Sequence, residues 1–97
     1  MPTYVSLLNW TGQGIKKVKE TTKRSKAFLD RAGKMKVKVR EIYWTMGHYD
    51  VVVIMEAPDD EAISRLMLHE GALGNVKSET LRAFSAQEMT QILKEIP

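Results

Sequence analysis

The chain has 97 residues, of which 43% are apolar and 28% charged, which predicts one small globular domain over residues 1–97 and excludes disordered and fibrous classes. It contains no cysteine, which excludes a disulfide framework, a thiol nucleophile and a cysteine-built metal site. The longest apolar run, Val51 to Met55, is far too short to span a membrane, and no charged leader precedes an apolar stretch. We therefore expect a cytoplasmic protein without membrane contact.

The net charge of +3 is distributed unevenly along the chain. Residues 16–40 carry eleven Lys or Arg against two acidic residues, whereas residues 41–97 carry four against ten. Such a basic segment either contacts phosphates or forms the solvated face of a helix and the next strand. It holds a single aromatic residue, Phe28, and hence no stacking platform for bases. The pattern disfavours nucleic-acid binding and favours a solvated face.

The first elements are a short strand, Thr3 to Leu8, and a helix that ends near Gly33. Thr21 is a possible N-cap, so we expect a break in this helix near residues 20–21. Its buried stripe would hold positions spaced three and four apart, with Phe28 beside them: Ile15, Val18, Thr22, Ser25, Leu29 and Ala32.

Two strands follow. Residues 36–44 alternate between polar and apolar and slip at Glu41–Ile42, which indicates a bulge. Gly47 supplies a turn before the strand Tyr49 to Met55. Because the connection is short, the two strands should form an antiparallel hairpin.

A second helix should begin at the N-cap Asp59 and end at Gly71 or Gly74. Its buried stripe would hold Ala62, Ile63, Leu66 and Met67. Val76 to Phe84 is predicted to be a fourth strand. Ser85 and Glu88 then form a capping box that opens a last helix, whose apolar positions are Met89, Ile92, Leu93 and Ile96.

The order β-α-β-β-α-β-α predicts a ferredoxin-like α+β sandwich, with βαββαβ followed by a C-terminal helix and a four-stranded antiparallel sheet. Residues 51–55 look apolar on both faces, and one layer of helices cannot cover the large apolar groups expected on the sheet: Tyr4, Leu8, Trp10, Ile42 and Trp44. We expect a second copy to pack on the uncovered face as a homodimer or higher oligomer, forming a dimeric α/β-barrel with the last helix near the seam.

The segment Gly47-His48-Tyr49-Asp50, followed by four apolar residues and by Pro58 to Ala62, resembles the signature of the GYD domain family. Residues 14–21, 73–76 and 79–84 resemble other segments of that family, so the resemblance covers nearly the whole chain. It implies a ferredoxin-like fold of the dimeric α/β-barrel kind and no established activity.

The candidate catalytic residues are His48 and Asp50, which lie two apart at the start of a strand and would share one face. By analogy with cofactor-free isomerases and monooxygenases on this fold, either could act as a base while Tyr49 or Trp44 positions an aromatic substrate. A structural reading is simpler: the Asp50 carboxylate next to a turn accepts backbone N–H groups or pairs with a cation such as Arg82 or Lys16.

No cofactor or metal is predicted. The chain has two histidines, His48 and His69, in no ligand-like spacing. Gly12-Gln13-Gly14 precedes a helix, but Lys17 replaces the third glycine of the dinucleotide fingerprint, so a dinucleotide site is not expected. The helix N-terminus with Lys16 could still hold a phosphate or carboxylate.

The expected ligand pocket is formed by two tryptophans, Trp10 and Trp44, together with Tyr49 and Arg82. Three hypotheses remain: a homo-oligomeric protein that binds a small organic molecule, a cofactor-free enzyme, and a regulatory or nucleic-acid-binding module that uses the basic helix.

Overall fold

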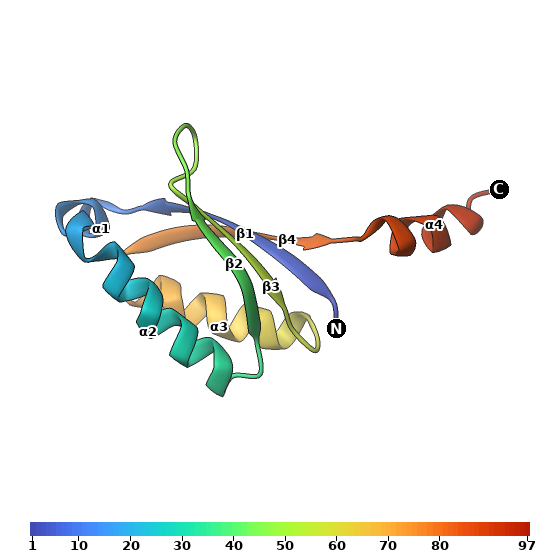
Figure 1. Ribbon diagram of the computed structural model, residues 1–97, viewed down its shortest axis with the longest axis horizontal. Coiled ribbons are helices and arrows are strands. Elements are labelled where there is room, and N and C mark those ends of the chain that lie inside the picture. Colours follow the sequence, from blue (N-terminus) through green and yellow to red (C-terminus); the bar gives the residue numbers. More distant parts are fainter.

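The computed structural model describes residues 1–97. In chain order its elements are β1 (Thr3–Trp10), α1 (Gly12–Lys16), the 3-10 turn η1 (Val18–Glu20), α2 (Thr21–Lys34), β2 (Lys38–Trp44), β3 (Val51–Glu56), α3 (Asp60–Ala72), β4 (Val76–Ala83) and α4 (Ala86–Lys94). The strands form one antiparallel sheet in the order β2-β3-β1-β4. Helices α2 and α3 cover one face, as the ferredoxin-like prediction requires (Figure 1). None of the helices has the length and apolarity that a membrane crossing requires.

The core lies between the sheet and its helix layer. Alternate residues of the two central strands point into it, so Val51, Val53 and Met55 of β3 are buried while Val52 and Ile54 are only half-buried. From the helices, the core receives Phe28 and Ala32 of α2 and the predicted stripe of α3, Ala62, Ile63, Leu66 and Met67.

The β2–β3 hairpin forms as expected. The pairing register shifts between Val39 and Glu41, which places the bulge at Arg40, one residue before the predicted slip. Gly47 adopts a φ of 105°, a left-handed conformation that favours glycine. Because of the bulge, Ile42 pairs with Val53 and both face the helices.

The first helical segment breaks where the sequence indicated, but its buried face differs from the prediction. η1 separates α1 from α2, and the turn changes the phase of the helix. Ala32 of the predicted stripe and Phe28 beside it are buried, whereas Ile15 and Leu29 of that stripe are 49% and 44% exposed. Thr21 is the first residue of α2 rather than its N-cap.

The capping residues of the later helices are those predicted. Asp59 accepts a hydrogen bond from the Ala62 N–H at 2.8 Å, and Ser85 and Glu88 form a complete capping box. Gly74, with a φ of 86°, follows α3. Helix α4 extends from the end of β4 away from the rest of the molecule, and none of its residues is buried (Figure 1).

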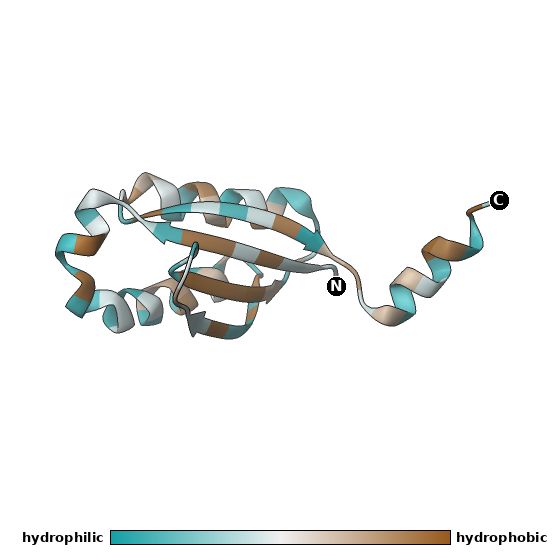
Figure 2. Cartoon of the chain, turned by 90° about the horizontal axis from the view of Figure 1, so that it is seen from above, coloured by the Kyte–Doolittle hydropathy of each residue, from teal (hydrophilic) through white to brown (hydrophobic).

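The opposite face of the sheet carries apolar side chains and no helix. Five large groups were expected to be more than one layer of helices could cover, and all of them lie on the helix-facing side with Val51 and Val53: Tyr4, Leu8, Trp10, Ile42 and Trp44. By strand alternation and register, the uncovered side has its own apolar set, which we call the outer face: Val5, Leu7, Tyr43, Val52, Ile54 and Leu81. Figure 2 shows the brown hydrophobic stretches along these strands, with the helices behind them.

Candidate functional site

A cavity of about 160 Å³ lies between the sheet and α2 and is partly open to solvent. Every strand contributes to it, α2 forms its other wall, and the end of α3 with the start of β4 closes one end. Ten of its sixteen lining residues are hydrophobic, a composition typical of sites for small organic molecules. We call this the α2 cavity.

Both tryptophans of the chain line the α2 cavity. Trp10 comes from the end of β1 and Trp44 from the end of β2. The indole N–H of Trp44 donates a 3.0 Å hydrogen bond to the Thr21 hydroxyl, which ties the strand to the first residue of α2. Phe28 adds a third aromatic ring from α2. The structure therefore brings the two tryptophans of the expected pocket together in one cavity lining.

Two arginines and one glutamate are the charged residues of the cavity lining. Arg24 is occupied structurally, because its guanidinium donates to the carbonyl oxygens of Lys17 and Gly14 at 3.1 and 3.2 Å. Gly14 belongs to α1 and Lys17 is its C-cap, and the Lys17 carbonyl also accepts from the Glu20 N–H at 3.0 Å. Arg24 thus holds α1 against α2.

Arg31 forms an ion pair with Glu70 across the two long helices. Both contacts are made by the Nη2 atom, one of them at 2.9 Å from Oε2. The side chains are 27% and 11% exposed. The Nε–H of Arg31 is buried and has no acceptor within the protein. Arg31 therefore brings a positive charge to the cavity lining and keeps one donor that no protein atom accepts from.

Sequence reasoning missed Arg24, Arg31 and Glu70. A usable signal was present in the basic segment, residues 16–40, which contains only three arginines. Two of these, Arg24 and Arg31, lie four residues before and three residues after Phe28. That spacing places all three on one helix face. The other basic residues of this segment are exposed, which agrees with a solvated face.

Tyr49 and Arg82 do not line the α2 cavity, so the structure separates them from the two tryptophans. Arg82 pairs with Tyr4 across the sheet, at the opposite end of β1 from Trp10. It donates to Glu88 at 3.2 Å and stacks on Phe84, 4.5 Å from the ring centre, and thereby anchors the start of α4. Its role in the structure is to orient that helix.

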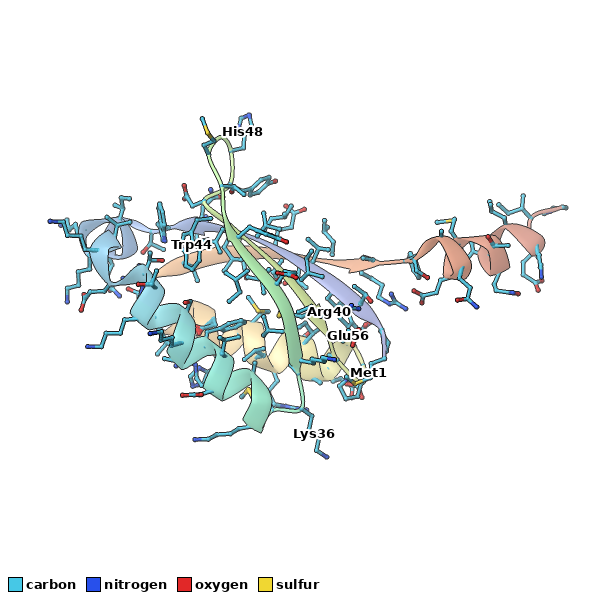
Figure 3. All side chains as sticks on the ribbon, in the orientation of Figure 1. Met1, Lys36, Arg40, Trp44, His48 and Glu56 are labelled. Carbon is cyan, nitrogen blue, oxygen red and sulfur yellow. The ribbon has the colours of Figure 1, made fainter.

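His48 and Asp50 also lie outside the cavity. His48 is exposed at the tip of the β2–β3 loop, well away from Trp44 (Figure 3). The Asp50 carboxylate accepts hydrogen bonds from the Trp10 N–H at 2.9 Å and from Asn9 at 3.4 Å. This is the structural arrangement that the sequence offered as the alternative to catalysis, with backbone N–H donation in place of a cation.

The glycine segment before α1 has a packing role. The ideal Cβ of an alanine at Gly14 would lie 2.0 Å from the carbonyl oxygen of Asn75. Thr11 caps the short helix by accepting from the Gly14 N–H at 3.1 Å. No three His, Cys, Asp or Glu side chains meet in a group that could hold a metal ion.

A buried tyrosine of the core is hydrogen-bonded to a carboxylate. The Tyr4 hydroxyl donates to Oδ1 of Asp60 at 2.5 Å. Burial, followed by this bond to a carboxylate, raises the pKa of Tyr4 to about 12. At the start of α4, backbone hydrogen bonding at Ser85 and the neighbouring Arg82 lower the pKa of Glu88. Neither group lines the cavity.

Comparisons with known proteins agree with this architecture. The family model of the GYD domain matches residues 4–93. A Thermus thermophilus protein named "Glutamine synthetase and cystathionine beta-lyase binding protein" is 32% identical over 95 residues, covering 97% of this chain and 100% of that protein. The crystal structure of a Thermus thermophilus protein superposes with a TM-score of 0.58 at 26% identity, covering 89% of this chain and 96% of the other.

Proposed function

This chain belongs to the GYD domain family, and we propose that it is a homodimeric binding protein that holds a small organic ligand in the α2 cavity. The observation that carries the proposal is the cavity itself. Its walls are mainly apolar, three aromatic rings contribute to them, and a few polar groups converge on it. Binding is better supported than catalysis, because neither His48 nor Asp50 lines this cavity.

A pair of serine substitutions tests the binding role. Ser25 is half-buried and lines the cavity, whereas Ser64 is exposed on α3. Leucine at position 25 should fill part of the cavity, so Ser25→Leu should abolish binding of small aromatic molecules such as benzyl alcohol, and Ser64→Leu should not. The readout is the fluorescence of the two tryptophans during titration. No fluorescence response in the unmodified protein, or equal binding by the two variants, would contradict the proposal.

The homodimer is supported by the outer face. Its apolar side chains belong to all four strands and no helix covers them. If a second copy packs on it about a two-fold axis, the outer faces of both subunits are covered at once. Sheets commonly pack face to face in this way.

The rim of the outer face also suits a second copy. Arg40 and Glu56 form an ion pair at 2.9 Å there (Figure 3), and Glu41, Lys77 and Glu79 bring charges of both signs to the same side of the sheet. A surface with both signs of charge can be complementary to itself under two-fold symmetry.

Helix α4 offers a further contact for the second copy. Its apolar side chains are not covered by the rest of the chain: Ile92 is 40% exposed and Leu93 is 55% exposed. Ile96, which follows the helix, is 63% exposed. We propose that α4 packs against the other subunit at the edge of the sheet pair. Native mass spectrometry should find twice the 11.1 kDa subunit mass, and a bare monomer at micromolar concentration would refute the dimer.

A second candidate function is suggested by the relative that is named as a binding protein for glutamine synthetase and cystathionine beta-lyase. By that similarity, we propose that the homodimer docks on a metabolic enzyme. Purified glutamine synthetase and cystathionine beta-lyase from the same source as this chain, immobilised in turn, should retain it from solution. Retention equal to that on an unrelated immobilised protein would remove this candidate.

A further inference from the structure

We propose that the ligand of the α2 cavity is a small aromatic carboxylate whose anionic group binds at Arg31. The inference rests on the proposed ligand-binding function and specifies the chemical class of the ligand. It is carried by three observations: the size of the cavity, its excess positive charge, and the unpartnered donor of Arg31.

The size and walls select the hydrophobic part of the ligand. A volume of about 160 Å³ is close to that of cavities that accommodate a benzene ring, roughly 150 Å³. Trp10, Phe28 and Trp44 present aromatic surfaces, and aromatic rings pack favourably against one another in offset or edge-to-face arrangements. A single aromatic ring with a short substituent therefore matches the space.

The charges select the polar part. Two guanidinium groups, Arg24 and Arg31, line the cavity against one carboxylate, Glu70, which leaves one formal positive charge unbalanced. A charge in a mainly apolar cavity is less screened than at the surface, so an anionic ligand is favoured over a neutral one of the same shape.

The unpartnered donor identifies where the anion binds. Arg24 already donates to two backbone carbonyls. Arg31 gives only its Nη2 atom to Glu70 and keeps its Nε–H buried without an acceptor. Buried donors are rarely left without partners, and a carboxylate oxygen would satisfy this one by a charge-assisted hydrogen bond.

Benzoate and benzyl alcohol are the matched probes. They share a ring and differ in whether the polar group is an anion. Because both tryptophans line the cavity, their fluorescence reports binding of each probe directly. A charge-assisted hydrogen bond should make benzoate bind at least about tenfold more tightly than benzyl alcohol. Equal affinities would overturn this inference and leave the binding role intact, whereas no response to either probe would overturn both.

Arg31→Lys tests the site. Lysine keeps the positive charge opposite Glu70 but has no equivalent of the Nε–H donor. Benzoate should lose about tenfold in affinity or more while benzyl alcohol changes little, and Arg65→Lys, on the exposed side of α3, should change neither. Unchanged benzoate binding by Arg31→Lys would overturn the inference.

Glu70→Gln provides a test that does not alter the arginine. Removing the carboxylate increases the positive charge of the cavity and releases Nη2 of Arg31 for the ligand. Benzoate should then bind more tightly relative to benzyl alcohol than in the unmodified protein. A preference that stays the same or falls, in a variant with an unchanged circular dichroism spectrum, would overturn the inference.

Discussion

At the residue scale, close packing against the Asn75 backbone allows only glycine at position 14. The approach of Asn75 leaves no space for a Cβ, whereas a Cβ at Gly33 would meet nothing within 4 Å. We expect Gly14→Ala to lower the free energy of unfolding by about 2 kcal/mol or more. Gly33→Ala should raise it by roughly 0.5 to 1 kcal/mol, because alanine favours a helix. Urea denaturation of both variants measures the difference, and similar effects would contradict the packing argument.

The raised pKa of Tyr4 predicts that the free energy of unfolding falls at alkaline pH. Its pKa is raised from 10.0 to about 12 in the folded protein, so between these values the unfolded chain loses the tyrosine proton while the folded protein keeps it. Stability from this group is complete below pH 10 and declines as the pH rises towards 12. Between about pH 8 and about pH 11 the unmodified protein should lose about 1 kcal/mol more unfolding free energy than Tyr4→Phe. Parallel losses in the two proteins would show that Tyr4 is not responsible.

The residues that the sequence offered for a ligand pocket do not all line the α2 cavity. Trp10 and Trp44 were expected in a pocket because aromatic walls with a few polar groups are typical of small-molecule sites, and both line the α2 cavity. Arg82 and Tyr49 lie elsewhere, because strand order and the loop path depend on long-range pairing. Arg31 and Glu70 meet only when α2 and α3 pack side by side, which no local pattern specifies.

At the element scale, two substitutions on α2 test which face of this helix is buried. Phe28 and Leu29 are neighbours, yet Phe28 is 7% exposed and Leu29 is 44% exposed. We expect Phe28→Ala to cost about 3 to 4 kcal/mol of unfolding free energy and Leu29→Ala less than about 1 kcal/mol. Chemical denaturation distinguishes them. A larger cost at Leu29 would mean that the helix presents the face predicted from spacing alone.

The elements themselves were largely predictable, and the exceptions share one cause. Caps such as Asp59 and Ser85 act within a few residues, so their sequence signals are reliable. A break near residues 20–21 was also predictable, but its effect on helix phase was not, because the three residues of the 3-10 turn rotate the side chains that follow. Leu29 therefore lies on the exposed side despite its regular spacing.

At the scale of the whole molecule, the outer face predicts how assembly should respond to a charge. Leu81 on β4 is 42% exposed on this face, and Leu68 on α3 is 74% exposed on the helix layer. Leu81→Lys should leave the subunit folded but weaken the dimer about a hundredfold or more, because the ammonium group would be desolvated at the interface. Leu68→Lys should leave assembly unchanged. Light scattering measures both masses, and an intact Leu81→Lys dimer would place the interface elsewhere.

The projecting helix gives the molecule an elongated form of 51 × 31 × 19 Å, and this has a consequence for its dynamics. Helix α4 has only nine residues, and isolated helices shorter than about 12 residues are marginal in water. Its capping box and the Arg82–Glu88 contact secure only its first turn. Order in residues 86–94 should therefore depend on what docks against them. Slowed amide exchange in this segment as protein concentration rises would make the C-terminus a built-in reporter of association.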